Sequence, residues 1–488
     1  MHQDVPLTTA APGEAGAALT PIDAGDRIAA LDIIRGFALI GIFLMNVEWF
    51  TRPISELGRG IDPSLHGLDY AVSWLVYVFV QGKFWTLFSL LFGIGFAVML
   101  GRAETRGRAF VTPYLRRILG LFLFGIAHFI LVWTGDILHN YAITALALLL
   151  VVTRNWKLWL GLLVSFAATA VALKSGALMA PIAVLVLVGV LMFFLHRGSL
   201  ARWWKWGVTL YSLMFLLGLI GAGVTAVYPQ IRSPETAEQI GKRQERLAER
   251  AKERVEEIRI DSRGSYAEAV RYRAGKFAED MPDAAGLSFM ALPMFMIGFW
   301  FVRAGVVARL REHRALFRKL AAWTLPIGMA MTLLSVWLVP SFPGDGMGGR
   351  DPARMTAVSL FQLGALLLCL GYFAGLVLLL GTRAGRWLAP LGHAGRMALT
   401  NYIGASVIST LFFFGYGLGY WGQLSRPGQM AFVAVVFALQ VAFSWLWLRH
   451  FRYGPLEWAW RALTYWQLPP MRRKRSVAAT ADGTVHPA

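Results

Sequence analysis

Repeated runs of apolar residues, each long enough for a helix to cross a lipid bilayer, are the feature that most limits what this chain can fold into. A helix needs about 20 apolar residues to span the hydrocarbon core. Such runs lie near residues 29–50, 69–100, 114–134, 137–153, 158–174, 177–195, 207–228, 287–303, 320–340, 356–380, 396–415 and 429–448. We therefore predict an all-α, polytopic integral membrane protein with about 12 transmembrane helices, the second of them broken at Gln81, Gly82 and Lys83.

Composition supports this fold class and excludes others. Hydrophobic residues make up 57% of the chain and charged residues 15%, whereas soluble domains have about 45–50% apolar and about 25% charged residues. These proportions exclude a soluble enzyme and a nucleic-acid-binding domain for the bulk of the chain. The one cysteine, Cys369, excludes a disulfide within the chain and a cysteine-based metal site. We predict no metal site.

The distribution of basic residues predicts the orientation. With the N-terminus inside, the inward loops hold 26 Lys and Arg residues and the short outward loops hold 6. Cytoplasmic loops carry such an excess of Lys and Arg. We therefore predict a multi-pass protein of the bacterial cytoplasmic (inner) membrane with both termini in the cytoplasm. The formal net charge of +19 then reflects orientation and attraction to membrane lipids, and no nucleic acid is expected as a partner.

One large hydrophilic segment interrupts the apolar runs. Residues 229–285 contain 12 basic and 12 acidic residues, and we predict a partly helical extracytoplasmic loop. Charges at i, i+3 and i+4 between residues 237 and 258 are typical of a solvated helix. This helix is a spacer or a cap over an outward-facing site. The predicted domains are a disordered cytoplasmic tail (1–26), an N-terminal transmembrane half (27–228), the loop (229–285), a C-terminal transmembrane half (286–466) and a basic disordered tail (467–488).

Ionisable residues inside apolar helices are costly and therefore mark candidate sites. On the first helix, Asp32 and Arg35 are spaced to pair across one turn, and Asn46 follows Arg35 by eleven residues. Eleven residues return to nearly the same helix face about 16 Å further along. The three residues therefore predict a polar stripe from the inner mouth toward the outer leaflet. Alternatively, Asp32 and Arg35 only anchor the helix at the inner interface.

The third helix repeats this geometry. Arg116 and Arg117 lie at its inner end, and His128 follows Arg117 by eleven residues on the same face. Asp136 and His139 follow with i, i+3 spacing at the outer mouth. A carboxylate so placed can orient an imidazole as a general base. The alternative is that His128 is a hydrogen-bonded packing residue.

Further polar residues lie near the two mouths. Tyr141 closely follows His139, and His66 in the first outward loop is another imidazole within reach of the outer mouth. Lys83 interrupts the second helix and needs an anion, either Asp32, Asp136 or a ligand. We expect Asp32, Arg35, Lys83, His128 and Asp136 to line one internal cavity.

The C-terminal half carries a second polar group at the inner side. Arg396 and Asn401 give the eleventh helix a polar inner end. Glu457 and Arg461 are spaced i, i+4 on a short interfacial helix, and we expect them to form an ion pair that stabilises it.

These stretches resemble a known family. Residues 31–42 with Asn46, residues 83–95 and residues 128–142 resemble the N-terminal half of bacterial YeiB-like proteins. The segment Gly-Arg-Met-Ala-Leu-Thr-Asn-Tyr at 395–402 and the segment 451–464 resemble the signature of the domain of unknown function 418. The resemblance covers nearly the whole chain. It implies an inner-membrane protein but specifies no activity.

A weaker resemblance concerns the first helix alone. Its Leu-Asp-x-x-Arg-Gly segment at 31–36 is similar to the first helix of heparan-alpha-glucosaminide N-acetyltransferase and of acyltransferase-3 proteins. This resemblance implies transfer of an acyl group from a cytoplasmic donor to an acceptor on the far side. Acyltransferase-3 proteins have a histidine eleven residues after the arginine, where this chain has Asn46. The catalytic imidazole would then be His128, or His66 at the loop position that the glucosaminide enzyme uses.

Two classes of function follow. In the first, acyl-CoA is the co-substrate, its phosphates bind Arg35, Arg116, Arg117 and Lys83, and an imidazole deprotonates a periplasmic or lipid-linked acceptor. No covalently bound cofactor is expected. In the second, the protein is a small-molecule or lipid transporter or flippase, and the same polar stripe is a wet path. A structural membrane protein without turnover is a third reading.

Overall fold

The computed structural model describes residues 28–174, 176–196, 198–228, 236–281, 283–342 and 351–473. Every regular element among these residues is a helix. The α-helices are α1 (Ala29–Asn46), α2 (Gly67–Phe79), α3 (Lys83–Thr105), α4 (Val111–Leu131), α5 (Leu138–Thr153), α6 (Trp156–Ala172), α7 (Met179–Leu195), α8 (Ala201–Val227), α9 (Ala237–Arg263), α10 (Tyr266–Asp280), α11 (Ser288–Arg303), α12 (Arg314–Leu338), α13 (Pro352–Leu380), α14 (Leu391–Arg396), α15 (Ala398–Phe413), α16 (Arg426–His450) and α17 (Pro455–Tyr465). Short 3₁₀ helices include η2 (Val47–Phe50) and η3 (Ile54–Glu56). The predicted tail 1–26 and most of the predicted tail 467–488 lie outside the described residues.

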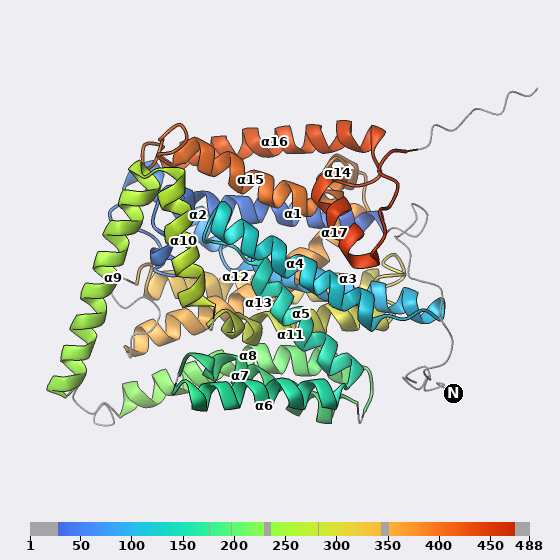
Figure 1. Ribbon diagram of the computed structural model, residues 1–488, viewed down its shortest axis with the longest axis horizontal. Coiled ribbons are helices and arrows are strands. Elements are labelled where there is room, and N and C mark those ends of the chain that lie inside the picture. The colour runs from blue at the N-terminus through green and yellow to red at the C-terminus, as the bar shows by residue number, and fades with distance from the viewer. Residues whose placement is uncertain are drawn as a thin grey trace, which may run out of the picture.

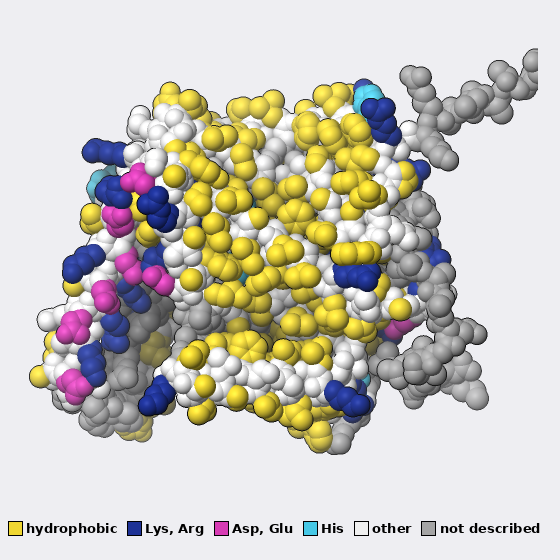
Figure 2. Space-filling view, viewed as in Figure 1, with side chains coloured by type: hydrophobic (Ala, Val, Ile, Leu, Met, Phe, Trp, Pro, Cys, Tyr) yellow, Lys and Arg dark blue, Asp and Glu magenta, His cyan; other side chains and the backbone are white. Residues whose placement is uncertain are grey.

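The all-α membrane fold is confirmed. Within the described residues, 8 helical stretches are long and apolar enough to cross a membrane, and the shorter helices α5, α6, α7 and α15 are also apolar. The total of 12 crossings stays a prediction. Large apolar side chains such as Leu160 on α6, Leu217 on α8 and Trp337 on α12 are more than half exposed. Figure 2 shows hydrophobic side chains across the middle of the molecule and charged side chains gathered at its two ends, as lipid on the sides requires.

The second apolar stretch, Gly67–Thr105, is broken as predicted. Helix α2 ends at Phe79 and α3 begins at Lys83. Between them, Gly82 has a φ of +81°, in the left-handed region that glycine enters at little cost. The break therefore results from a single glycine that redirects the chain inside one apolar run.

The two halves of the sequence share one core. Helix α1 packs on α14, and α3 packs on α11 and α13. A Cβ atom at Gly93 of α3 would lie 2.1 Å from the carbonyl oxygen of Phe295 on α11. A Cβ atom at Gly298 of α11 would lie 2.2 Å from the carbonyl oxygen of Leu90. Small residues at both positions allow the two backbones to approach closely, as in many membrane helix pairs.

The bundle has two distinct ends (Figure 1). Helix α17 and the start of α1 lie at one end, which we call the basic end because Arg35, Arg102, Arg117, Arg396 and Arg461 gather there. Helices α9 and α10 lie at the opposite end, which we call the hairpin end. The hydrophilic segment and the arginine cluster are therefore separated by the length of the bundle.

The hairpin of α9 and α10 is docked onto the bundle. Each helix begins with a capping box, formed by Thr236 and Gln239 in α9 and by Ser265 and Glu268 in α10. The predicted helix 237–258 is present and continues to Arg263. Helix α10 lies against the end of α4, where the Tyr266 hydroxyl donates a hydrogen bond to the Leu131 carbonyl oxygen at 2.9 Å.

Two carboxyl groups of α9 are shielded from water where this helix docks onto the bundle. The Oε1 atom of Glu257 accepts a hydrogen bond from the backbone N–H of Ile54 at 2.6 Å. Nearby, burial first and the Glu257 carboxylate second raise the pKa of Asp261, Arg273 lowers it, and the net result is about 8. Asp261 is therefore protonated in the docked hairpin at neutral pH.

We expect the docking of the hairpin to weaken as the pH rises. The pKa of Asp261 is 3.8 in its ordinary state, so the stabilisation is fully present below that value and is lost as the pH rises through about 8. Between these two pKa values, the equilibrium constant for undocking of the hairpin rises by up to about tenfold per pH unit. The undocking is measured by hydrogen exchange of the α10 amides at pH 5 and pH 8.5. Asp261→Asn is the control, because it removes the group that causes this pH dependence. Equal pH responses of wild type and variant would contradict the assignment.

Candidate functional site

A large cavity enters the bundle from the basic end. Its volume is about 260 Å³, and helices α1, α3, α4, α5, α14, α15 and α17 contribute to its wall. The arginines in the wall are Arg35, Arg102, Arg117, Arg396 and Arg461, and the carboxylates are Asp32 and Glu457. The wall therefore carries an excess of positive charge in the described residues, which favours an anionic occupant.

The arginines are held by specific neighbours. Arg35 donates to Asp32 at 2.6 Å, and its side chain is 31% exposed. The guanidinium of Arg117 lies 3.7 Å from the centre of the Trp460 ring. Stacking on an aromatic face orients a guanidinium and leaves its N–H groups available for a phosphate or carboxylate. The basic end of the cavity is thus preorganised for an anionic group.

The deeper wall of the cavity is apolar and aromatic. Phe88, Phe92, Leu121 and Tyr141 lie along it, and Tyr402 of α15 also lines it. The Tyr141 hydroxyl donates to the carbonyl oxygen of Trp85 at 2.7 Å, which fixes the ring. The cavity therefore changes from basic at its mouth to apolar inside, as expected for an occupant with a charged head and a less polar arm.

A buried carboxylate with two imidazoles lies beside this apolar part. Asp136 lies in the loop between α4 and α5, and its Oδ1 atom is 2.8 Å from Nδ1 of His128. Its Oδ2 atom is 2.7 Å from Nδ1 of His139 and accepts the backbone N–H of that residue at 3.1 Å. The side chains of Asp136 and His128 are fully buried. Burial alone would raise the pKa of Asp136, but the two histidine contacts outweigh it and hold this pKa below its usual value.

The ionised carboxylate fixes the tautomers of both histidines. A carboxylate only accepts hydrogen bonds, so each neutral ring carries its proton on Nδ1 and an acceptor lone pair on Nε2. Nε2 of His128 is buried and has no hydrogen-bond partner among the described residues. The His128 ring lies 5.2 Å from the Tyr402 ring. This arrangement presents an oriented base next to the cavity wall.

Sequence details bring the cluster together. A Cβ atom at Gly125 of α4 would lie 2.4 Å from the backbone nitrogen of His139 and 2.9 Å from Oδ2 of Asp136. Only glycine leaves room there for the start of α5. Helix α10 covers the same region, because its Phe277 ring lies 5.6 Å from the ring of His139. Arg273 of α10 also donates to the Val132 carbonyl oxygen in the loop that carries Asp136.

The structure brings together many of the residues that we predicted. Asp32, Arg35, Arg117, Tyr141, Arg396, Glu457 and Arg461 line the large cavity. His128, Asp136 and His139 form the adjoining cluster. Asn46 and Asn401 line a second, small cavity.

Three predicted residues lie elsewhere. Arg116 is turned toward Trp466, with its guanidinium 5.3 Å from that ring, and is not part of the cavity wall. His66 is exposed and directly precedes α2, outside both cavities. Lys83 is fully buried but also lies outside the large cavity. The expectation of one cavity shared by Asp32, Arg35, Lys83, His128 and Asp136 is therefore met only for the first two.

Lys83 has a different partner from the anion that we expected. Its Nζ atom donates to the carbonyl oxygen of Tyr77 at 3.1 Å and lies 4.0 Å from the centre of the Phe361 ring. The turn at Gly82 folds the side chain back over the end of α2, where carbonyl groups have no helical partner. The negative end of the helix dipole and an aromatic face take the place of an anion.

The expected ion pair between Glu457 and Arg461 is also replaced by other contacts. Oε1 of Glu457 accepts the backbone N–H of Leu399 at 2.6 Å and of Thr400 at 3.0 Å. Arg461 instead lies over the ring of Tyr453, at 4.6 Å. The chain breaks at Met397 before α15, so the first N–H groups of α15 need an acceptor, and Glu457 supplies it.

Two residues of the site escaped prediction. We attributed Arg102 only to the orientation of the chain, because it lies in a predicted inward loop, yet it is part of the cavity wall. We assigned Tyr402 only to the polar inner end of the eleventh helix, whereas the structure places it in the cavity wall next to His128. A tyrosine inside an apolar run carries a weak sequence signal, because most such residues only pack.

Comparisons with known proteins agree with the resemblance that the sequence showed. Residues 301–467 match a family model described as "Protein of unknown function (DUF418)". The chain is 29% identical to YxaH of Bacillus subtilis (strain 168), over 94% of this chain and 99% of that protein. It is 28% identical to YeiB of Escherichia coli (strain K12), over 92% of this chain and 100% of that protein. No solved structure matches the chain. The chain is thus similar to YeiB over nearly its whole length, its C-terminal third matches the DUF418 model, and its apolar helices are those of a membrane protein.

Proposed function

We propose that this protein is a membrane acyltransferase, which takes an acyl group from an acyl-CoA at the basic end and passes it to an acceptor from the hairpin end. One observation carries the proposal. Asp136 orients His128 as a base with an unpartnered Nε2 atom, and this base lies beside the apolar part of a cavity whose mouth is lined by arginines. The arginines at the mouth suit the phosphates of the donor, and the apolar part beside His128 suits its reactive thioester.

The dimensions of α4 suit such a donor. Arg117 and His128 are eleven residues apart on one helix, which is about 16 Å along the axis. An extended pantetheine arm has a similar length, so phosphates near Arg117 place the thioester near His128. Arg35, Arg102, Arg396 and Arg461 lie in the same cavity wall and add positive charge.

The transfer step uses the lone pair of His128. Nε2 takes the proton of the acceptor hydroxyl or amine as the acceptor heteroatom attacks the thioester carbonyl carbon. The new C–O or C–N bond forms, the C–S bond breaks, and the leaving thiolate receives the proton from Nε2. Asp136 holds the imidazole and stabilises its protonated form. Neither the imidazole nor the carboxylate is consumed.

This function requires the basic end to face the cytoplasm, because acyl-CoA is a cytoplasmic donor. The excess of Lys and Arg in the inward loops supports this orientation in the inner membrane. The hairpin and the Asp136 loop would then face the periplasmic side, where a soluble or lipid-linked acceptor arrives.

Sided membrane vesicles test the proposal. We expect acyl-CoA added to inverted vesicles, which expose the basic end, to be consumed, and acyl-CoA outside right-side-out vesicles to remain intact. Vesicles without the protein provide the control, and free CoA is measured with a thiol reagent. A transporter would instead move a labelled substrate across the membrane without cleaving it. If no acyl-CoA is consumed in either orientation, the acyltransferase proposal is wrong and the transport hypothesis is preferred.

A further inference from the structure

Helix α10 covers the cluster of Asp136, His128 and His139, which we call the Asp136 cluster. The Phe277 ring of α10 lies 5.6 Å from the His139 ring and 5.2 Å from the ring of Phe129 on α4. The side chains of Asp136 and His128 are fully buried, and that of His139 is 6% exposed. A molecule that approaches from the hairpin end therefore meets α10 before it meets the cluster.

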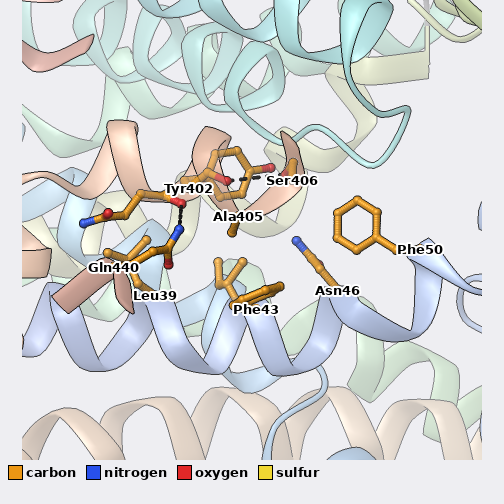
Figure 3. A pocket seen from close by; sticks show the side chains of 10 residues that line it. Leu39, Phe43, Asn46, Phe50, Tyr402, Ala405, Ser406 and Gln440 are labelled. Atoms are coloured by element: carbon orange, nitrogen blue, oxygen red, sulfur yellow. Dashed lines mark hydrogen bonds between the residues drawn. The ribbon is translucent and has the colours of Figure 1, made fainter. Parts of the chain in front are cut away.

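The space beside Tyr402 is too small to serve as a second route from that end. The small cavity there has a volume of about 10 Å³, which is at most the room that one water molecule needs. Figure 3 shows Phe50 at the edge of this space, and its ring centre lies 4.2 Å from that of Trp133, in the loop that carries Asp136. Aromatic packing closes the bundle here, so the route for an acceptor leads past the hairpin.

Helix α10 is fastened to the end of α4 by two side chains. The Tyr266 hydroxyl donates to the Leu131 carbonyl oxygen at 2.9 Å, and the buried Arg273 guanidinium donates to the Val132 carbonyl oxygen. Carbonyl groups at the end of a helix have no partner within it. His128 lies three residues before Leu131, the last residue of α4. Displacement of α10 therefore uncovers the backbone next to the candidate base.

The face by which the hairpin docks is small. The buried residues of α9 and α10 are Glu257, Ile260, Ala269 and Arg273, whereas most residues of α11 are buried. Two of these four are ionisable, and the cost of removing a charge from water offsets much of what its contacts contribute. Elements that bury little apolar surface open at a lower free energy than the core. The hairpin can therefore undock while the bundle stays folded.

We propose that the hairpin of α9 and α10 is a lid, which closes the Asp136 cluster toward the hairpin end and opens to admit the acceptor. The role in acceptor entry rests on the acyl-transfer function proposed above, whereas the lid itself rests on the contacts of α10. The closed lid keeps water at that end away from the base, which protects the thioester from hydrolysis. The donor enters at the basic end and needs no movement of the lid.

Chemical modification of His139 tests the lid without any turnover. Diethyl pyrocarbonate, which reacts with accessible imidazoles, is added to the full-length protein in nanodiscs. Mass spectrometry gives the rate of modification at His139 relative to that at His66, which is exposed before α2. We expect Arg273→Gln to raise this ratio about tenfold or more, because it removes a charged hydrogen bond that holds the lid on α4. Arg273 makes no printed contact with His139, so a rise reports movement of α10.

A milder variant and a matched control accompany this measurement. Tyr266→Phe removes only the hydroxyl that bonds Leu131, and we expect it to raise the ratio about twofold to tenfold, the effect of one neutral hydrogen bond. Arg271→Gln removes the same charge from an exposed position of α10 and should leave the ratio unchanged. Unchanged ratios in both lid variants with the helix content intact, or an equal rise in Arg271→Gln, would overturn the lid.

Locking the lid then tests its control of acceptor entry. The rings of Tyr266 on α10 and Tyr416, in the loop after α15, have centres 5.3 Å apart. Cysteines at these two positions, with Cys369→Ala to remove the one native thiol, are joined in nanodiscs by a short bifunctional thiol reagent that a reductant cleaves. We expect the cross-link to lower acyl transfer to ethanolamine or ethanol about tenfold or more and to leave the Kd of acyl-CoA unchanged.

The reductant should restore transfer, and each single-cysteine variant should be unaffected by the reagent. Normal transfer in fully cross-linked protein would overturn the role of the lid in acceptor entry. If the wild type consumes no acyl-CoA with either probe, the proposed function fails, whereas the modification of His139 still decides whether the hairpin is a lid.

Discussion

Replacing Asp136 by asparagine is expected to slow acyl transfer by about three orders of magnitude while the donor still binds. General bases contribute about 10² to 10⁴ in rate, and the loss of an orienting carboxylate is of similar size. Asp136 accepts a hydrogen bond from each of two imidazoles. An asparagine amide would donate to one of them and force its proton onto Nε2, which removes the lone pair that takes the proton of the acceptor.

The measurement is a single-turnover rate with saturating acyl-CoA, together with the Kd of the donor. Asp62→Asn is the control, because Asp62 accepts a hydrogen bond from Ser64 and lies 3.6 Å from Arg52, far along the chain from the cluster. His128→Gln should match the loss in Asp136→Asn, since both remove the oriented base. His139→Gln should lower the single-turnover rate less than His128→Gln does, because His139 contacts the other oxygen of the Asp136 carboxylate. A near-normal rate in Asp136→Asn with an intact fold would exclude this base.

Replacing Arg117 by glutamine is expected to weaken donor binding by about 10-fold to 100-fold. A hydrogen bond to a charged group contributes about 1.5–3 kcal/mol, and each 1.4 kcal/mol is about tenfold in Kd. Arg117 lines the large cavity and is held over Trp460. The variant loses the charge that faces the donor phosphates, whereas the catalytic cluster is unchanged.

Arg116→Gln is the matched control, because the neighbouring side chain points to Trp466 outside the cavity wall. Binding is followed by fluorescence of a labelled acyl-CoA at low and high salt. The wild-type affinity should fall with salt more steeply than that of Arg117→Gln, since screening acts on the charge that the variant lacks. Equal losses in both variants would indicate a general effect of basic charge at this end of the bundle.

Periodicity along single helices could be read from the sequence. The eleven-residue spacing placed Arg117 and His128 on one face of α4, and the structure puts Arg117 in the cavity wall and His128 beside it. The i, i+3 spacing of Asp136 and His139 corresponds to a contact of 2.7 Å. The first prediction works because helix geometry is local and regular. The second works because Asp136 lies two residues before α5 begins and its carboxylate accepts the backbone N–H of His139 in the first turn of that helix.

Contacts formed where helices begin and end could not be read in this way. Lys83 finds the carbonyl oxygen of Tyr77 because the chain turns at Gly82, and Glu457 caps α15, about sixty residues earlier in the chain. Both contacts use backbone groups that have no partner within their helix, and these groups are known only when the residues at which the helices begin and end are known. The site role of Tyr402 depends on two cavities meeting at one ring, and residue spacing carries no information about that.

The depth of the large cavity has an electrical consequence. We expect water that enters from the basic end to carry the potential of that side inward along the arginines of the cavity wall. A larger share of the transmembrane voltage is then expected to fall across the remaining part of the bundle, which includes His128 and Asp136. Moving one elementary charge through 100 mV costs about 2.3 kcal/mol. We therefore expect proton transfer at this cluster to depend on the membrane potential.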